Sequence, residues 1–97
     1  MTYTVATTDE FDDWLGELAD EKAKGAITDR IVRVQSGLFG DSKSLGDKVS
    51  ELRIHVGPGY RVYYTIQARV VVILLCGGDK SDQKQNMKLA KKLAAEL

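Results

Sequence analysis

The chain has 97 residues, 43% of them hydrophobic and 29% charged, which is the composition of one folded domain and excludes a disordered segment. One cysteine and one histidine exclude an intramolecular disulfide and a metal site built from His and Cys, so we expect no metal and no other cofactor. The 14 basic and 14 acidic side chains cancel overall but not locally. Residues 1–48 carry six basic and ten acidic side chains, and residues 49–97 carry eight and four. A polyanion would be attracted mainly to the second half.

No membrane or export signal is evident. The first residues lack the basic and apolar regions of a signal peptide. The longest apolar run, Val70–Cys76, is far shorter than the roughly 18 residues that span a bilayer. A single free cysteine fits a reducing compartment. We therefore expect a cytoplasmic protein that does not bind membranes.

The first half predicts a short strand followed by two helices. Tyr3–Ala6 is the predicted strand, and Thr7 with Glu10 forms a capping box that begins a helix running to about Lys24. Gly25 is predicted to break it. The apolar faces of the two helices are formed by Phe11, Trp14, Leu15 and Leu18, and by Ile27, Ile31 and Val34. Gly37 ends the second helix, and Leu38–Lys48 is predicted to be a loop.

The second half predicts three antiparallel strands and a last helix. Val49–Val56 and Tyr60–Ile66 alternate in polarity on either side of a Gly-Pro-Gly turn, and Val70–Cys76 is apolar on both faces, as in a central strand. Ser81 is predicted to cap a helix over Asp82–Leu97. The order β-α-α-β-β-β-α indicates the α+β class, with a small antiparallel sheet, two N-terminal helices and a C-terminal helix.

Strand alternation places a group of polar side chains on one face of this sheet. They are Glu51, Arg53, His55, Arg61 and Tyr63. Guanidinium groups bind phosphate oxygens bidentately and keep their charge, and an imidazole or a phenol can move a proton. Attack of a ribose 2′-hydroxyl on the neighbouring phosphate needs these groups for positioning, proton transfer and charge stabilisation. We take Arg53, Arg61, His55 and Tyr63 as candidate catalytic residues, with Lys80 as a further positive group.

Structural explanations for the same residues remain open. The charged side chains could form a cross-strand ladder on a solvent-facing sheet, and Tyr63 could pack over that sheet. His55 has no partner identifiable in the sequence and could be an ordinary surface histidine. Lys84, Lys88 and Lys91 recur at helical spacing on the last helix, where they could contact RNA phosphates or only form a solvated helix face.

Three motifs carry a resemblance to a known family. They are Glu51-Leu52-Arg53-Ile54, Gly57-Pro58-Gly59-Tyr60-Arg61-Val62-Tyr63-Tyr64 and Gly77-Gly78-Asp79-Lys80. From about Phe11 to Leu93 the chain resembles the RelE/ParE toxin superfamily, and more narrowly its HigB-like "addiction module killer" branch. The resemblance implies the RelE-like fold, with two N-terminal helices packed on a short antiparallel sheet and a C-terminal helix.

The resemblance also implies a function and partners. The implied function is that of the toxin of a type II toxin–antitoxin system, a metal-independent and ribosome-dependent endoribonuclease that cuts mRNA and inhibits translation. Arg61 matches the arginine of the family's GYR motif, Arg53 the basic residue of the preceding strand and Lys80 a basic residue after the last strand. Lys43 also fits, and we count it with the lysines of the last helix as RNA-binding. The resemblance implies as partners the ribosome with its mRNA and a cognate antitoxin, which in this branch is of the helix-turn-helix type. Nothing in this chain resembles a DNA-reading helix, so we expect it to make no direct DNA contacts and operator binding to come through the antitoxin.

Two other functions fit the same resemblance. Several RelE-like toxins carry a Tyr or His near the C-terminus for proton transfer, and this sequence has neither after Tyr64. The ParE branch shares the fold and inhibits DNA gyrase, so a gyrase inhibitor is the first alternative. A catalytically inactive RelE-fold protein that binds an antitoxin is the second.

Overall fold

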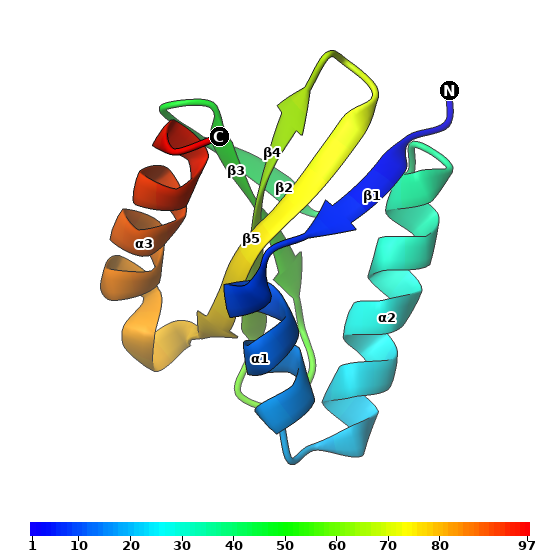
Figure 1. Ribbon diagram of the computed structural model, residues 1–97. Helices are drawn as coiled ribbons and strands as arrows, with labels where there is room; N and C mark the ends of the chain where they lie inside the picture. Colours follow the sequence, from blue (N-terminus) through cyan, green and yellow to red (C-terminus); the bar gives the residue numbers. More distant parts are fainter.

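One five-stranded sheet organises the chain (Figure 1). The computed structural model describes residues 1–97, with the elements β1 (Thr4–Thr7), α1 (Asp9–Glu17), α2 (Glu21–Gln35), β2 (Ser42–Gly46), β3 (Val49–Ile54), β4 (Tyr60–Gln67), β5 (Val71–Asp79), the 3₁₀ turn η1 (Lys80–Asp82) and α3 (Gln83–Ala95). The strands lie in the order β1-β5-β4-β3-β2, with β1 parallel to β5 and the other neighbours antiparallel. The predicted α+β class, the antiparallel meander and the N-terminal strand are confirmed, and this strand lies at the edge of the sheet, parallel to β5.

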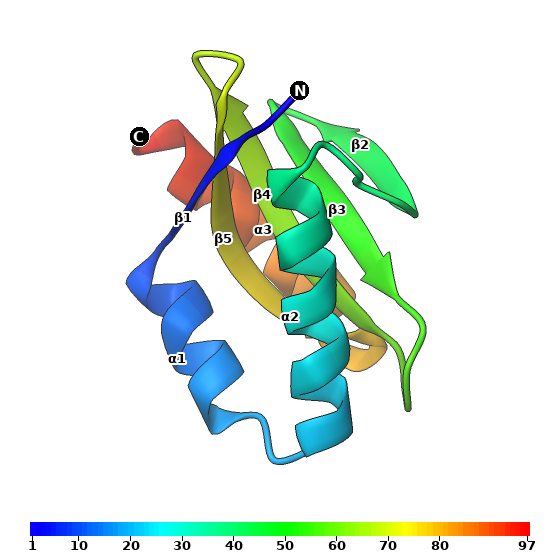
Figure 2. The same ribbon diagram turned by 90° about the vertical axis from the view of Figure 1, so that its right-hand side faces the viewer.

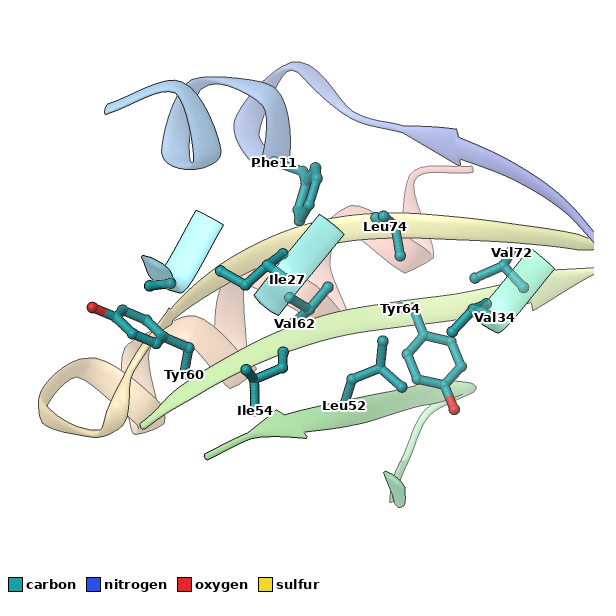
Figure 3. Close-up of a cluster of buried hydrophobic side chains, with 11 residues drawn as sticks. Phe11, Ile27, Val34, Leu52, Ile54, Tyr60, Val62, Tyr64, Val72 and Leu74 are labelled. Atoms are coloured by element: carbon teal, nitrogen blue, oxygen red, sulfur yellow. The ribbon is translucent and has the colours of Figure 1, made fainter. Parts of the chain in front are cut away.

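Helices cover both faces of this sheet. α1 and α2 lie on one face and α3 on the other (Figures 1 and 2). The core under α1 and α2 (Figure 3) consists of Phe11, Ala23, Ile27, Val34, Leu52, Ile54, Tyr60, Val62, Tyr64, Val72 and Leu74. The core under α3 consists of Val49, Tyr63, Ile73, Leu75, Cys76 and Ala90. α3 packs mainly over β5 and β4, and on its side of the sheet Lys43 of β2 stays exposed and Arg53 of β3 partly exposed. None of the helices has the length and apolar content needed to cross a bilayer.

The boundary between the first two helices differs from the prediction. Thr8, not Thr7, caps α1: its hydroxyl accepts a hydrogen bond from the Phe11 N–H at 3.0 Å. The helix ends at Glu17, and Asp20 begins α2 by accepting hydrogen bonds from two backbone N–H groups of the next turn. Gly25 lies inside α2 and does not break a helix. The capping carboxylate decides the boundary here, because one glycine inside a helix costs only about 1 kcal/mol.

The segment predicted to be a loop, Leu38–Lys48, contains strand β2. Its sequence lacks an alternating apolar pattern, because β2 is an edge strand that is mostly exposed. Pairing with β3 defines it, through a tight turn in which Asp47 and Lys48 both have positive φ. The sheet therefore has one strand more than the sequence predicts.

The central strand β5 is longer than predicted and contains a bulge. Tyr63 pairs with Cys76, but Tyr64 pairs with Leu74, so Leu75 is an extra residue in β5. Leu75 and Cys76 consequently both join the core under α3. Beyond the bulge β5 continues to Asp79, whose side chain accepts hydrogen bonds from Ser81. Ser81 therefore lies in η1 and does not cap the last helix, which begins at Gln83.

Arg30 of α2 ties the loop before β2 to the end of β3. Its guanidinium donates hydrogen bonds to the backbone carbonyl oxygens of Arg53 (2.6 Å), Phe39 (2.8 Å) and Asp41 (3.0 Å). The Arg53 N–H in turn donates to the Asp41 carbonyl at 2.9 Å. Arg30 thus places Asp41 beside the strand that carries Arg53.

Replacing Arg30 with methionine is expected to destabilise the fold. The variant Arg30→Met keeps an unbranched apolar stem but leaves these carbonyl oxygens without their donor, so the free energy of unfolding should fall by about 2–3 kcal/mol in urea titrations. Arg33→Met, one turn further along α2 at an exposed position, is the control and should change it by less than about 0.5 kcal/mol. Equal effects of the two substitutions would contradict the role of Arg30.

Two glycine-to-alanine substitutions should have opposite effects on stability. A Cβ atom on Gly77 would overlap the indole ring of Trp14, so Gly77→Ala should reduce the free energy of unfolding by about 1–3 kcal/mol. A Cβ atom on Gly25 would meet nothing within 4 Å, so Gly25→Ala should increase it by roughly 0.5–1 kcal/mol. Urea denaturation measures both, and a stabilising Gly77→Ala would contradict the tight contact with Trp14.

Candidate functional site

Two rows of paired residues cross the α3 side of the sheet. Lys43 of β2, Glu51 of β3 and Tyr63 of β4 are register partners in the first row. Arg53 of β3 and Arg61 of β4 are partners in the second. Side chains of directly paired residues project from the same face. We call the part of this side that α3 leaves uncovered, with Lys43, Glu51, Arg53 and Arg61, the open face.

A buried carboxylate joins the two arginines of the open face. Glu51 Oε2 accepts a hydrogen bond from Arg53 Nε at 3.2 Å and another from Arg61 Nη1. The Glu51 side chain is 1% exposed, whereas those of Arg53 and Arg61 are 31% and 15% exposed. The cross-strand ladder considered from the sequence is therefore present. The ladder leaves the arginines able to bind a ligand, because each guanidinium group has five N–H donors and uses only one of them to bind Glu51.

His55 has a partner that the sequence did not reveal. It lies just beyond the end of β3 with 69% of its side chain exposed, and its Nε2 is 2.6 Å from Asp41 Oδ2. The hydrogen bond from His55, with a smaller contribution from the charge of Arg53, holds the pKa of Asp41 below its usual value. Asp41 comes this close because its backbone carbonyl is held by Arg30 and Arg53. The pair forms an exposed imidazole–carboxylate couple at the rim of the open face.

Lys80 lies at the same rim, in η1. Its side chain crosses Gly59, in the turn between β3 and β4: a Cβ atom on Gly59 would lie 2.9 Å from Lys80 Cε. Gly59 has a φ of 87°, which an L-residue rarely adopts. The glycine therefore provides both the turn and the space for the lysine stem, and the ammonium group stays exposed.

Tyr63 shares the face of Arg61, as strand alternation predicted, but it does not reach the open face. It is fully buried in the core under α3, and its hydroxyl has no hydrogen-bond partner. Burial, followed by the nearby charge of Glu51, raises the pKa of Tyr63 to about 12. Tyr63 therefore packs over the sheet, as the structural explanation proposed from the sequence had it. Its buried position conflicts with the predicted role in proton transfer.

The predicted RNA-binding lysines come from two elements, β2 and α3. Lys43 is exposed on the open face. Lys84 lines a shallow groove of about 320 Å³ together with Lys80, and Lys88 is exposed one turn further along α3. Lys91 lies near the other end of α3 and pairs with Asp47 at 3.3 Å. Lys84, Lys88 and Lys91 thus follow one another at helical spacing along α3, and Lys91 is the one of the three that forms an ion pair.

The side chains that commonly bind metal ions are dispersed over the structure. No three His, Cys, Asp or Glu side chains lie close enough together to hold a metal ion. The one cysteine, Cys76, is buried, and burial raises the pKa of its thiol to about 12. A thiol in this environment stays protonated and unreactive at neutral pH.

Removing the Tyr63 hydroxyl tests its position. Tyr63→Phe eliminates a buried polar group without a partner, so stability at pH 7 should be unchanged or higher by about 1 kcal/mol. An unfolded tyrosine ionises near pH 10 and the folded one near 12, so the native protein loses stability as the pH rises from 10 to 12, and Tyr63→Phe should lose less. Urea titrations at pH 7 and 10.5 measure both effects. A loss of more than about 1 kcal/mol at pH 7 would contradict the unpartnered hydroxyl.

Comparisons with known proteins agree with this fold. A family model described as phage-derived protein Gp49-like matches residues 13–96. A protein of Haemophilus influenzae described as uncharacterized is 55% identical over 97 residues, which cover 100% of this chain and 98% of the other. A solved structure of a double-arginine mutant of the E. coli toxin RelE in the free state superposes with a TM-score of 0.76 at 18% identity, covering 95% of this chain and 98% of the other.

A second solved structure is the toxin–antitoxin complex RelBE2 from Mycobacterium tuberculosis. One of its chains superposes with a TM-score of 0.65 at 19% identity, covering 82% of this chain and 100% of the other. At these identities the two superpositions show the fold, and the family model covers most of the sequence. The chain therefore belongs to the Gp49-like family, and its fold is that of the RelE toxins.

Proposed function

We propose that this chain is the toxin of a type II toxin–antitoxin system and that it cleaves mRNA on the ribosome. The open face carries the proposal: two partly exposed guanidinium groups are held by a buried carboxylate beside an exposed His55–Asp41 pair and Lys80. Cations of this kind bind and neutralise a phosphodiester. The RelE fold supports the proposal, since one superposed structure is described as the toxin RelE and the other as a toxin–antitoxin complex.

The proposed reaction is attack of a ribose 2′-hydroxyl on the adjacent phosphorus. Arg53 and Arg61 bind the non-bridging phosphate oxygens and stabilise their developing charge. With His55 Nε2 donating to Asp41, the lone pair of His55 Nδ1 is free to accept the 2′-hydroxyl proton. The P–O2′ bond forms and the P–O5′ bond breaks. The leaving 5′-oxygen is stabilised by the Lys80 ammonium group and takes a proton from solvent, which leaves a 2′,3′-cyclic phosphate and a 5′-hydroxyl.

The proposed partner is a cognate antitoxin. The open face presents cationic side chains around one buried carboxylate, so an acidic segment is the natural cover for it. One of the superposed structures is a complex of a toxin with its antitoxin, which supports a partner of this kind. A helix-turn-helix antitoxin and the HigB-like branch remain predictions from the sequence, as does the cytoplasmic location.

Expression of variants during active translation tests the proposal. Wild-type chain should arrest growth and create new 5′ ends in a reporter mRNA, detected by primer extension. Arg61→Ala should reduce their yield at least about 100-fold, because it removes a charge-stabilising donor. His55→Ala should reduce it about 10- to 100-fold by removing the proton acceptor. Arg69→Ala, which removes the same charge from an exposed turn between β4 and β5, should cleave like the wild type.

The outcomes separate the alternatives. Because Arg61 partners a buried carboxylate, its variant is compared with the wild type by thermal melting, and His55→Ala keeps the test valid if Arg61→Ala unfolds. Growth arrest with DNA damage and no new mRNA ends would contradict RNA cleavage and indicate a gyrase-directed toxin. Neither arrest nor cleavage by the wild type would indicate a RelE-fold protein that only binds its antitoxin.

A further inference from the structure

Glu51 is the acidic residue of the open face, and the proposed reaction gives it no role. Its side chain is 1% exposed, so RNA does not reach the carboxylate. A negative charge at this point lowers the potential that the open face offers to a polyanion. The presence of Glu51 therefore needs an explanation other than attraction of RNA.

The two arginines beside it would not hold their positions alone. Arg53 and Arg61 are direct register partners on adjacent strands, and like charges in this arrangement repel each other. Each arginine side chain also has about 2 kcal/mol of rotamer entropy that favours disorder. Without a counter-charge the two guanidinium groups would move apart.

The Glu51 carboxylate, on the same face of the sheet as the two arginines, provides that counter-charge. A single oxygen, Oε2, accepts hydrogen bonds from both Arg53 and Arg61. Burial strengthens this connection, because a carboxylate removed from water is stable only when it is paired. No other side-chain hydrogen bond of either arginine is present, so the remaining guanidinium donors are available above the sheet.

We propose that Glu51 is a positioning residue that holds Arg53 and Arg61 at the separation needed to bind one phosphate group. The geometric part of this inference stands on the contacts, and its consequence for RNA cleavage rests on the proposed function. The proposal predicts effects of opposite sign. Loss of the negative charge strengthens binding to ribosome and mRNA, whereas loss of the arrangement slows cleavage. A residue with a purely structural role would weaken both.

The test compares ribosome binding with the rate of cleavage in the full-length chain. Glu51→Gln removes the charge and keeps the shape, so affinity for mRNA-loaded ribosomes should rise about two- to fivefold. The single-turnover rate of mRNA cleavage on saturated ribosomes should fall about 10- to 100-fold, as expected for misplaced catalytic groups. Glu51→Asp keeps the charge but shortens the side chain, so it should bind like the wild type and cleave more slowly. Glu96→Gln, at the exposed end of α3, is the matched charge control and should cleave like the wild type.

A spectroscopic measurement tests the positioning of Arg53 by Glu51 without relying on RNA cleavage. In ¹⁵N NMR spectra the Arg53 Nε–H should be protected from solvent exchange in the wild type and exchange at least about tenfold faster in Glu51→Gln. Slower cleavage with equal or tighter ribosome binding supports the proposal. Cleavage by Glu51→Gln within twofold of the wild type overturns it, as does a parallel loss of binding, cleavage and thermal stability.

Failure of the proposed function is a separate result. If the wild type cleaves no RNA, the NMR measurement alone decides the geometric inference. Faster Arg53 Nε–H exchange in Glu51→Gln than in the wild type and in Glu96→Gln supports it. Equal exchange in the three proteins overturns it.

Discussion

The central strand β5 is buried on both faces, and the positions of the other elements depend on that constraint. β5 pairs with β1 on one side and β4 on the other, so its backbone groups are satisfied only inside the sheet. Its side chains then require a helical layer on each face, which α1 and α2 provide on one side and α3 on the other (Figure 2). Near its end, Gly77 and Gly78 leave room for Trp14 of α1 and Asn86 of α3 to contact the strand itself.

Coverage of β5 by a single helix leaves the open face exposed. α3 is one helix wide and lies over β5 and β4, so it buries Tyr63. The arginine row, two residues further along β3 and β4, stays partly exposed. Side chains with the same strand parity therefore have different surroundings. Those near α3 belong to a core, and those beyond it form a charged surface with a buried carboxylate beneath it.

The distribution of charge follows from the same layering. The acidic first half of the sequence supplies α1 and α2, and most of the cations of the second half lie on the other side of the sheet or on α3. A chain without net charge thereby presents a cationic face to one side. For the proposed function this arrangement allows phosphate binding without the strong non-specific attraction of a basic protein.

The sequence by itself determined the class of the fold, most of the elements and the face on which each strand residue lies, because periodicity is a local property of the backbone. It also placed Arg53 and Arg61 on one face of the sheet through strand parity. The sequence did not predict strand β2, since this edge strand has no apolar pattern. It also did not predict the helix boundary at Asp20, because the free energies of a helix cap and of a glycine inside a helix differ by only a small amount.

Only the tertiary structure decided which side chains of the candidate site are paired or covered. Asp41 is 14 residues from His55 and reaches it because Arg30, on a different element, holds the intervening backbone. Tyr63 lies two residues from Arg61 on β4 and on the same face of the sheet, yet α3 lies over it. Pairing and burial depend on which distant segments pack together, and the free energy of that packing is a property of the whole chain that no local pattern contains.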